Sequence, residues 1–493
     1  MVIVPLYIDG SEFGGVGTVS RENPARPSEQ VAEIAVGDAA TCMRAVTAAQ
    51  QAFSSWAAVD VATRVQQVAE AVDAASAGNV ARSRILAREL GKVAPDALGE
   101  MSFARALATY YGPVVRRQAA DTVVEDAEGR LVTLHEPYGV IGAITPWNAP
   151  VILASLKVVP ALMTGNTMVI KPSPLAPVAV TEFLTLVGSA LPAGVLNIIN
   201  GGADVGGVIV GDPRIAKISF TGGPTTARAI ATTAAARITP TVMELGGNDA
   251  AVFLDDAPFD DAMFERAVFG AFLTSGQVCM AIKRIFVPEA RAAEFVDGFT
   301  AAAERVLHTA DPLAEGTTMG PVVTREHQRR LIGLVESGRE AGGHVIELGT
   351  FEPPDPDGYW VRPTLVTGLA DLHPLVADEQ FGPTVPLLTY RDEDEAVRRA
   401  NSVDQALASS VWTADDERAW AFARRFRAGA TFVNCHNRAG TSLRASFGGR
   451  GASGHGREFG ELGVAEYLQS HSINYPNAIR FGEARGNAYP VPS

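Results

Sequence analysis

The feature that most constrains the fold begins at about residue 138, where short apolar runs alternate with helix-like stretches. Such alternation is typical of βαβ units, which build a parallel sheet covered by helices on both faces. Each run is followed, directly or within two residues, by Pro, Gly or Asn. Because ligands of these sheets bind beyond the carboxyl ends of the strands, we expect functional residues there. The runs are Val140–Thr145, Thr167–Ile170, Val195–Ile199, Ile215–Phe220 and Thr241–Leu245.

The residues before 138 follow a different pattern, and the first ~115 are expected to be mostly helical. Asp38 is a candidate N-cap for one helix, and a second helical stretch covers Val61–Ala87. A hairpin is predicted around Glu128-Gly129, between the apolar pairs Val123-Val124 and Leu131-Val132.

A second α/β segment is predicted from about residue 246 to 437. Its apolar runs lie at Ala250–Leu254, Arg284–Val287 and Thr431–Asn434. The last ~20 residues lack periodicity and are expected to form an extended tail. A chain of 493 residues is long enough for two to four domains with sizeable cores.

Composition excludes several classes of protein. A net charge of −14 argues against a general nucleic-acid binder, because such a chain has no positive field to displace phosphate counterions. Three cysteines in so long a chain make a disulfide framework improbable. The N-terminus lacks the pattern of a signal peptide, and the longest apolar stretch, Ala149–Met163, contains Lys157 and two prolines. We therefore expect a cytoplasmic protein without a membrane segment.

One familiar motif is present but out of context. The stretch Gly449–Gly454 satisfies G-x-G-x-x-G, yet no strand leads directly into it, so we do not expect it to bind a dinucleotide. The chain has no Walker A motif, no H-E-x-x-H and no G-x-S-x-G elbow. Its eight histidines are scattered, and we predict no metal site.

A stronger set of motifs lies at the ends of the apolar runs. The seven motifs, in their order along the chain, are Thr145-Pro146-Trp147-Asn148, Lys171-Pro172-Ser173, Phe220-Thr221-Gly222-Gly223, Glu244-Leu245-Gly246-Gly247, Gly276-Gln277-Val278-Cys279, Glu379-Gln380-Phe381-Gly382-Pro383 and Phe447-Gly448-Gly449. This ordered set resembles the NAD(P)-dependent aldehyde dehydrogenase superfamily, and because the motifs spread over nearly the whole chain, the resemblance is specific.

The resemblance implies an α/β architecture in three parts. Residues 1–117 and 138–245 would form a Rossmann-type NAD(P)-binding domain, and residues 246–437 an α/β catalytic domain. Residues 118–137 and 463–493 would form a small β oligomerisation arm and a C-terminal tail. Since an exposed hairpin edge needs a partner, a homodimer or homotetramer is expected.

Cys279 is the expected nucleophile, because a thiolate can attack an aldehyde carbon and form a thiohemiacetal from which hydride leaves to a nicotinamide. The competing interpretation of a lone cysteine is an inert buried thiol. By resemblance, the side-chain amide of Asn148 and the backbone N–H of Cys279 form the oxyanion hole. Outside that context, Asn148 is a simple turn residue.

By the same resemblance, Glu244 is the base that activates water to hydrolyse the thioester. Relatives that pass the acyl group to coenzyme A generally lack this glutamate, so Glu244 implies a free acid as product. Its alternative role is that of a capping carboxylate at a strand–helix turn.

The resemblance also implies a set of cofactor contacts, with Glu379 holding the nicotinamide ribose and Phe381 beside it. Lys171 is counted with both the catalytic and the cofactor residues, and it matches a position near the adenosine ribose. The full set is Ile144, Thr145, Pro146, Trp147, Lys171, Ser173, Pro174, Gly201, Phe220, Thr221, Gly222, Gly223, Leu245, Glu379 and Phe381.

Four departures from the family pattern concern the cofactor. Pro174 stands where relatives carry the glutamate that accepts the ribose 2′-OH and repels a 2′-phosphate. Gly223, Ala227 and Asn248 replace a common serine, glycine and lysine. We therefore expect weak discrimination, with NAD preferred because no basic cluster lies near Lys171, and with NADP also accepted.

The expected substrate is a bulky aldehyde. Three family pocket positions hold Ala149, Leu153 and Leu156, which are smaller than the aromatic residues or methionine often found there. An aromatic or medium-chain aldehyde is the first choice. A carboxylate-bearing semialdehyde is the alternative, because Arg438 and Arg444 lie in the loop before Phe447. The pocket is completed by Val278, Met280 and Phe447.

Two other classes of function stay open at this level. A cofactor-free cysteine hydrolase would use the same thiol, but no histidine is placed beside it by the sequence. A non-catalytic protein that retains the fold would not need Cys279, Glu244 and Asn148 together. The reaction of Cys279 with electrophiles would distinguish these classes.

Overall fold

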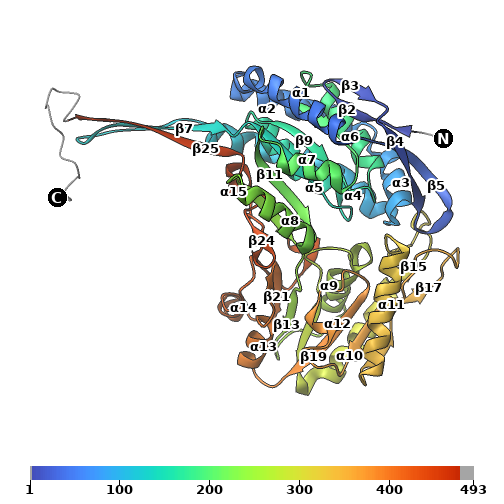
Figure 1. Ribbon diagram of the computed structural model, residues 1–493. Helices are drawn as coiled ribbons and strands as arrows, with labels where there is room; N and C mark the ends of the chain where they lie inside the picture. The colour runs from blue at the N-terminus through green and yellow to red at the C-terminus, as the bar shows by residue number, and fades with distance from the viewer. Residues whose placement is uncertain (1–2, 478–493) are drawn as a thin grey trace.

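A computed structural model describes residues 3–477, which form two lobes and a long arm (Figure 1). The first lobe is built on an eight-stranded sheet with the order β24-β12-β11-β8-β9-β10-β2-β3. The strands β8 to β12 are parallel to one another, and this confirms the parallel sheet predicted from the apolar runs. Their bounds are β8 Val140–Ile144, β9 Thr167–Lys171, β10 Leu196–Ile198, β11 Ile215–Gly222 and β12 Thr241–Leu245; β2 is Leu6–Ile8, β3 Ser11–Phe13 and β24 Gly454–His455.

Helices cover both faces of this sheet because successive residues of each strand point to opposite sides. Ile141 and Ala143 of β8 pack into one apolar cluster with α2 to α6, whereas Val140 and Ile144 pack into another with α1 and α7. The helices are α1 Ala39–Ala57, α2 Val61–Ser76, α3 Asn79–Leu90, α4 Ala94–Gln118, α5 Pro150–Met163, α6 Val178–Ser189, α7 Ala203–Gly211, α8 Pro224–Ala235 and α15 Gly460–Ala465.

The amino-terminal region differs from the sequence prediction. Residues 3–36, expected to be mostly helical with the rest of the first ~115, instead form five strands. The antiparallel pairing of β4 with β5 creates much of this structure, and such pairing depends on a partner rather than on local periodicity. The predicted stretch Val61–Ala87 is divided into two helices at Gly78. Asp38 does cap α1 by accepting from the backbone N–H of Thr41, as predicted. The further strands here are β1 Ile3–Val4, β4 Gly17–Asn23 and β5 Arg26–Val36.

The second lobe contains a seven-stranded sheet with the order β16-β18-β19-β14-β13-β21-β22. Two apolar clusters again lie on opposite faces, one with α9 and α10 and the other with α11 to α14. The strands are β13 Ala250–Phe253, β14 Arg284–Pro288, β16 His344–Glu347, β18 Thr364–Thr367, β19 Thr384–Tyr390, β21 Ala408–Trp412 and β22 Ala430–Val433; the helices are α9 Asp261–Phe272, α10 Ala292–Val306, α11 Arg325–Glu340, α12 Pro374–Ala377, α13 Glu393–Ala400 and α14 Asp416–Ala423.

Shorter elements complete this lobe. Two pairs of short strands, β15 with β17 and β20 with β23, lie outside the main sheets. The motif at Gly449–Gly454 spans β23, the turn after it and the start of β24, and Gly454 pairs with Glu244 of β12 at the edge of the first sheet. These elements are β15 His308–Thr309, β17 Thr350–Phe351, β20 Gln405–Ala406, β23 Arg450–Gly451 and the 3₁₀ turns Leu273–Gly276, Glu289–Arg291 and Asn437–Gly440.

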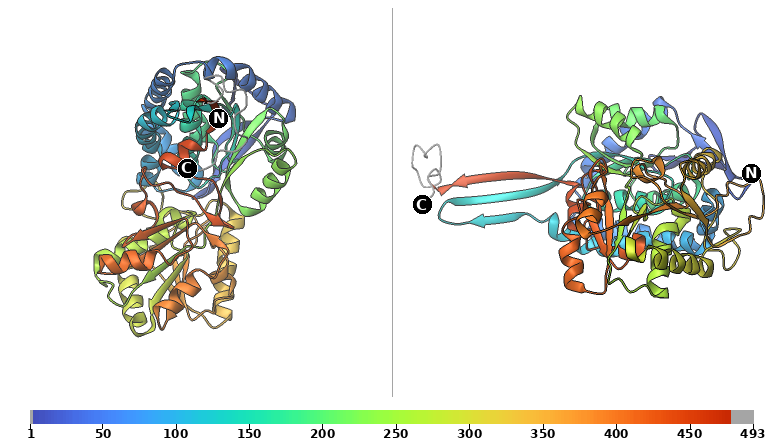
Figure 2. Two further views of the ribbon diagram at one scale, coloured as in Figure 1. Left: turned by 90° about the vertical axis from the view of Figure 1, so that its left-hand side faces the viewer. Right: turned by 90° about the horizontal axis from the view of Figure 1, so that it is seen from below.

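The arm is a three-stranded antiparallel sheet of β6 Thr122–Glu125, β7 Gly129–Pro137 and β25 Leu468–Pro476. β7 pairs with β25 from Pro137↔Leu468 to Gly129↔Pro476. It projects clear of both lobes (Figure 2). The part of the predicted tail at 478–493 lies outside the described residues. None of the helices within residues 3–477 combines the length and apolar character needed to span a bilayer.

Candidate active site

Two cavities meet at Cys279, between the two lobes. The apolar cavity, of about 120 Å³, is lined mainly by aliphatic and aromatic side chains. The glycine-lined cavity, of about 230 Å³, includes Gly222, Gly223 and Gly246 in its wall. Six residues line both: Asn148, Leu153, Thr221, Glu244, Leu245 and Cys279.

A strained turn presents Cys279. Thr274 and Ser275 adopt left-handed backbone angles, with φ of 54° and 56°, which are costly for residues other than glycine. Gly276 follows with φ of 69°, and a side chain there would come within 2.3 Å of the carbonyl oxygen of Gly382. The hydroxyl of Ser275 donates to the carbonyl of Gly320 at 2.8 Å, and this bond helps to hold the turn.

The surroundings of Cys279 set its protonation state. Burial, together with the carboxylates of Glu379, Asp249 and Glu244, raises the pKa of the thiol to about 12. The ammonium of Lys283 acts in the opposite direction. With this pKa, the thiol of the cofactor-free protein is protonated at neutral pH, so a base must take its proton before it can react.

Asn148 is fixed from two sides at the wall shared by the cavities. Its Nδ2 donates to the carbonyl of Gln277 at 3.1 Å, which leaves the second amide proton for another acceptor. The backbone carbonyl of Asn148 accepts a hydrogen bond from Lys92 Nζ at 2.9 Å. Lys92 is paired with the buried Glu100, whose other oxygen accepts from the N–H of Val151 at 2.8 Å, in the first turn of α5. The amide is therefore a preorganised donor.

Glu244, at the end of β12, is a buried carboxyl group poised to take up a proton. Within residues 3–477, its Oε1 has no hydrogen-bond partner. Burial and the carboxylate of Glu458 raise its pKa well above the usual range, with partial compensation by Lys157 and Arg457. Lys157 Nζ lies 2.7 Å from Glu458 Oε1. A carboxyl group with a raised pKa can act as a general base nearer to neutral pH.

The glycine-lined cavity combines an aromatic wall, a carboxylate and a helix N-terminus. Trp147 and Phe381 meet edge to face, with ring centroids 5.5 Å apart. A side chain at Gly246 would collide with Glu379, which lies directly over it. Gly223 is the N-cap of α8, and open space surrounds the position of its missing Cβ, so a phosphate can approach the backbone N–H groups of the helix.

Comparison with known proteins agrees with this geometry. Residues 13–473 match the sequence profile of the aldehyde dehydrogenase family. The chain belongs to the aldehyde dehydrogenase family. It is an NAD(P)-dependent oxidoreductase that acts on aldehydes.

Three relatives cover between 78% and 99% of the chain. A peroxisomal aminoaldehyde dehydrogenase from Pisum sativum is 34% identical over 391 residues, which is 78% of this chain and 77% of the relative. The crystal structure of a putative aldehyde dehydrogenase from Burkholderia cenocepacia is 32% identical, with a TM-score of 0.91 and 99% of each chain covered. A betaine aldehyde dehydrogenase from Staphylococcus aureus, solved with NAD⁺, is 28% identical, with a TM-score of 0.90 and 98% of each chain covered.

The residues of this aldehyde dehydrogenase fit a nicotinamide cofactor. Glu379 offers a carboxylate for ribose hydroxyls, and the start of α8 offers N–H groups for a pyrophosphate. The buried hydroxyl of Thr221, which lines the same cavity, has no hydrogen-bond partner among residues 3–477. These features together leave donors and acceptors facing the cavity for a polar ligand.

The structure separates the predicted cofactor residues into three groups. Pro146, Trp147, Thr221, Gly222, Gly223, Leu245, Glu379 and Phe381 line the glycine-lined cavity. Ile144 and Phe220 belong instead to the buried core of the sheet. The remainder, Thr145, Lys171, Ser173, Pro174 and Gly201, lie at or beyond the carboxyl ends of β8, β9 and β10 and line neither cavity.

Lys171 is buried at the end of β9. Burial lowers the pKa of its ammonium to about 8, and Asp204 in the first turn of α7 opposes this effect. Since Lys171 lines neither of the cavities around Cys279, its position suits a contact with a distant part of the cofactor rather than with the reacting carbon.

The predicted substrate residues mostly line the apolar cavity. Ala149, Leu153, Leu156, Val278, Met280, Arg438 and Phe447 are all in its wall. Arg444 is not, because its side chain is exposed beyond the cavity. Arg438 lies at the rim, where its guanidinium binds Asp96 Oδ1 at 2.9 Å.

Sequence reasoning missed three buried lysine–glutamate pairs around the site: Lys92–Glu100, Lys157–Glu458 and Lys283–Glu379, of which only Glu379 was predicted. Lys157 carried a signal, because it is the single charge within an otherwise apolar helix. A charge in such a place needs a partner when buried. The other pairs join segments that share no local pattern.

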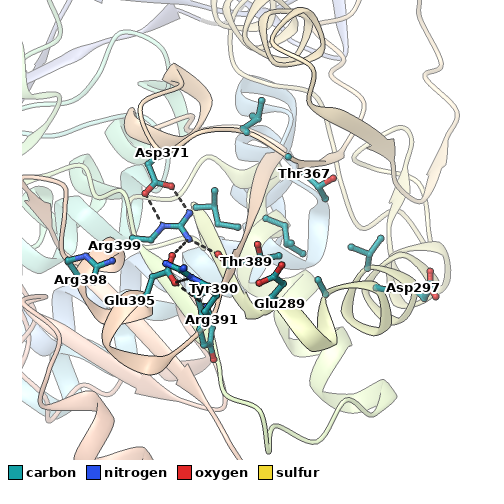
Figure 3. A pocket seen from close by; sticks show the side chains of 17 residues that line it. Glu289, Asp297, Thr367, Asp371, Thr389, Tyr390, Arg391, Glu395, Arg398 and Arg399 are labelled. Carbon is teal, nitrogen blue, oxygen red and sulfur yellow. Dashed lines mark hydrogen bonds and ion pairs between the residues drawn. The ribbon is translucent and has the colours of Figure 1, made fainter.

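A wider cavity, of about 950 Å³, lies elsewhere (Figure 3). It opens at the carboxyl ends of β14, β18 and β19 and does not include Cys279. Its central arginine, Arg399, is occupied by two hydrogen bonds to Asp371 at 2.6 and 2.8 Å. The described residues that line it include neither a cysteine nor a lysine that could attack an aldehyde.

Proposed function

We propose that this enzyme oxidises aldehydes to carboxylic acids, with Cys279 as nucleophile, Asn148 as oxyanion donor and Glu244 as base. The observation that carries the proposal is that these three side chains line both cavities. A substrate in the apolar cavity and a cofactor in the glycine-lined cavity would therefore meet at the same atoms.

The reaction begins when the Cys279 thiol loses its proton and its sulfur attacks the carbonyl carbon. Glu244 is suited to take that proton, because its Oε1 has no partner among the described residues. The new C–S bond places negative charge on the former carbonyl oxygen. The free amide proton of Asn148 and the backbone N–H of Cys279 stabilise this charge, and one such donor contributes about 3–4 kcal/mol.

The nicotinamide, when bound beside Glu379, supplies the hydride acceptor that turns the thiohemiacetal into a thioester. Glu244 then passes the proton it took from Cys279 to solvent and, ionised again, removes a proton from water, and the hydroxide adds to the thioester carbon. The C–S bond breaks, the acid leaves and the Cys279 thiolate is restored. Glu244 has to be ionised for this step, so its raised pKa makes hydrolysis dependent on pH.

We propose an aromatic or medium-chain aldehyde as substrate. Three phenylalanines, Phe103, Phe447 and Phe459, line one side of the apolar cavity, with Phe459 about 6 Å from each of the others. Leucine and isoleucine side chains line much of the remainder. Since each buried CH₂ is worth about 0.8 kcal/mol, a short aldehyde would forgo most of the available binding energy.

Two charged substrate classes are supported by particular observations. Arg438 at the rim could pair with the carboxylate of a semialdehyde if Asp96 released it. The names of the relatives point to amino- and betaine aldehydes, and aromatic rings such as the three phenylalanines can receive a cationic ammonium group. Lys92 and Glu100, which line this cavity, already neutralise each other, so neither charge is left to bind a charged substrate. An apolar aldehyde therefore matches the lining better than either charged class does.

NAD is the proposed preferred cofactor, with NADP accepted. Pro174 is exposed and offers neither a hydrogen bond to a ribose 2′-OH nor a charge against a 2′-phosphate. A cytoplasmic location is also proposed, because a catalytic thiol has to stay reduced and the cytoplasm is a reducing compartment.

The arm is the proposed contact between subunits of a homodimer or homotetramer. Its sheet has exposed apolar side chains at Val123, Val124 and Ile473, which a second chain could cover. Light scattering coupled to size-exclusion chromatography would measure the mass. A monomer at micromolar concentration would contradict the proposal.

The substrate proposal is tested with an aldehyde panel, by following reduction of NAD or NADP at 340 nm. The panel contains benzaldehyde, hexanal, succinic semialdehyde, betaine aldehyde and acetaldehyde. We expect the highest kcat/KM with benzaldehyde or hexanal. Preference for betaine aldehyde or the semialdehyde would favour the charged classes, and preference for acetaldehyde would refute a roomy apolar cavity.

A further inference from the structure

Lys283 stands out among the groups that the proposed mechanism does not use, because its ammonium lies at the junction of three segments. Its Nζ donates to Glu379 Oε1 at 2.9 Å, to the carbonyl of Cys279 at 3.1 Å and to the carbonyl of Gly247 at 3.2 Å. An ammonium has three protons, so these three acceptors satisfy it completely. The side chain is 2% exposed.

Each acceptor belongs to a different part of the wall around Cys279. Gly247 follows β12, Cys279 lies on the strained turn after α9, and Glu379 lies in the loop before β19. The backbone of Lys283 is itself anchored, because its N–H donates to the carbonyl of Asp249 at 3.0 Å. Through its Nζ atom, Lys283 thus connects the end of β12, the turn that carries Cys279 and the loop that carries Glu379.

The bonding of Glu379 shows what this junction achieves. Its Oε1 accepts from both Lys283 and the N–H of Gly247, the latter at 3.3 Å. Among the described residues its Oε2 has no hydrogen-bond partner, although the residue lines the glycine-lined cavity. Gly246 makes room for it, since a Cβ there would lie 1.9 Å from Oε2. One oxygen is held by the protein and the other stays available for a ligand.

We propose that Lys283 is a positioning residue that fixes the Glu379 carboxylate relative to the Cys279 turn, so that the cofactor ribose and the nucleophile are held in one frame. This inference rests on the proposed function only in taking the glycine-lined cavity as the nicotinamide–ribose site. Loss of the ammonium would free Glu379 to rotate and would leave a buried carboxylate without its counter-charge.

The first test measures NAD binding by calorimetry, without turnover, in a double-mutant cycle of Lys283→Met and Glu379→Ala. We expect Lys283→Met to weaken NAD binding about tenfold or more in the wild-type background. In the Glu379→Ala background the same substitution should change Kd by less than about threefold, because the group it positions is gone. A Kd within twofold of wild type, or an equal loss in both backgrounds, would overturn the proposal.

Lys217→Met is the matched control. Lys217 is also a buried lysine paired with a glutamate, at 2.7 Å from Glu466 Oε2, but it lines neither cavity. Its variant should keep the wild-type Kd for NAD even if its melting temperature falls. Should Lys283→Met fail to fold, Lys283→Gln replaces it in the same cycle, because the amide retains two donors without the charge.

The second test measures how the alkylation of Cys279 by iodoacetamide depends on pH in the cofactor-free protein. The charged groups around the thiol are Lys283, Glu379, Asp249 and Glu244. Because Lys283 is the only cation in this set, its removal should shift the alkylation profile to higher pH, and an unchanged profile would contradict its link to the nucleophile.

Comparing the KM for NAD with the KM for the aldehyde in steady-state kinetics separates this inference from the proposed function. Lys283→Met should raise the KM for NAD while the KM for the aldehyde stays near the wild-type value. If wild-type protein binds NAD but oxidises no aldehyde, the proposed function fails and the binding cycle still decides the role of Lys283.

Discussion

The two cavities at Cys279 are both backed by a buried lysine–glutamate pair, yet the pairs are bonded differently. Lys92 and Glu100, beside the apolar cavity, bind each other and backbone groups of Asn148 and Val151. Glu379, beside the glycine-lined cavity, keeps one oxygen free of protein partners. The first pair therefore holds the backbone around the apolar cavity, whereas the second leaves a carboxylate oxygen available to the glycine-lined cavity.

The largest expected effect removes the atom that both cavities share. Cys279→Ala should lower aldehyde oxidation by at least about a thousand-fold, because no other group lining the cavities can form the covalent intermediate. NAD binding should stay near the wild-type value, since the proposed contacts lie on other strand ends. Turnover at 340 nm and calorimetry measure the two properties, and residual activity above a few per cent would rule out Cys279 as the nucleophile.

Glu244→Gln tests whether the shared wall also supplies the base. Loss of the base should slow the steady state by about 100-fold or more, and no burst of reduced cofactor is expected in stopped flow, because acylation also needs the carboxylate to take the Cys279 proton. The rate of hydrolysis by the wild-type enzyme should also depend on pH. Because the pKa of Glu244 is raised, its carboxyl is protonated below that pKa and ionised above it, so wild-type hydrolysis should accelerate as pH rises. The Gln variant should lack this rise, and an identical pH profile would contradict the assignment.

Lys92→Met breaks the pair on the apolar side and complements Lys283→Met on the other. It removes the donor to the Asn148 carbonyl and leaves Glu100 buried without its counter-charge. We expect kcat to fall about 10- to 100-fold through loss of oxyanion positioning, with Kd for NAD unchanged. Equal losses of NAD affinity in both lysine variants would show that the two cavities are not distinct in this way.

The smallest effect concerns the far end of the cofactor. Wild type should favour NAD over NADP by less than about a thousand-fold in kcat/KM. Pro174→Glu should increase that preference by roughly ten- to a hundred-fold, because a charged hydrogen bond to the ribose is worth about 1.5–3 kcal/mol. Pro174→Gln serves as the control at the same position, because it adds a hydrogen-bonding side chain without a charge. An unchanged NAD/NADP ratio in Pro174→Glu would place the ribose elsewhere.

The sequence was sufficient for the parts of the site that lie on local motifs. Turn residues at strand ends, such as those around Asn148 and Glu244, are recognisable because parallel strands bring their carboxyl ends to one edge. The partner of Lys157 was not recognisable, because Lys157 and Glu458 are 301 residues apart and no local period connects them. The strands in residues 3–36 were missed for a similar reason, since β4 and β5 are stabilised by each other. Arg444 shows the opposite error, in which closeness in sequence to Phe447 did not mean closeness to the cavity.

The order in which the ribosome makes the strands has a consequence for the arm and for the base. β7 ends at Pro137, but its partner β25 begins only at Leu468, roughly 330 residues later. At roughly 5–20 residues per second, β7 would wait on the order of 20–60 s with an open edge during synthesis. Glu458, which pairs with Lys157 and faces Glu244, emerges over the same interval. A nascent chain that already contains Cys279 therefore still lacks Glu458, which raises the pKa of the base Glu244. During that time the open edge of β7 is a target for chaperones.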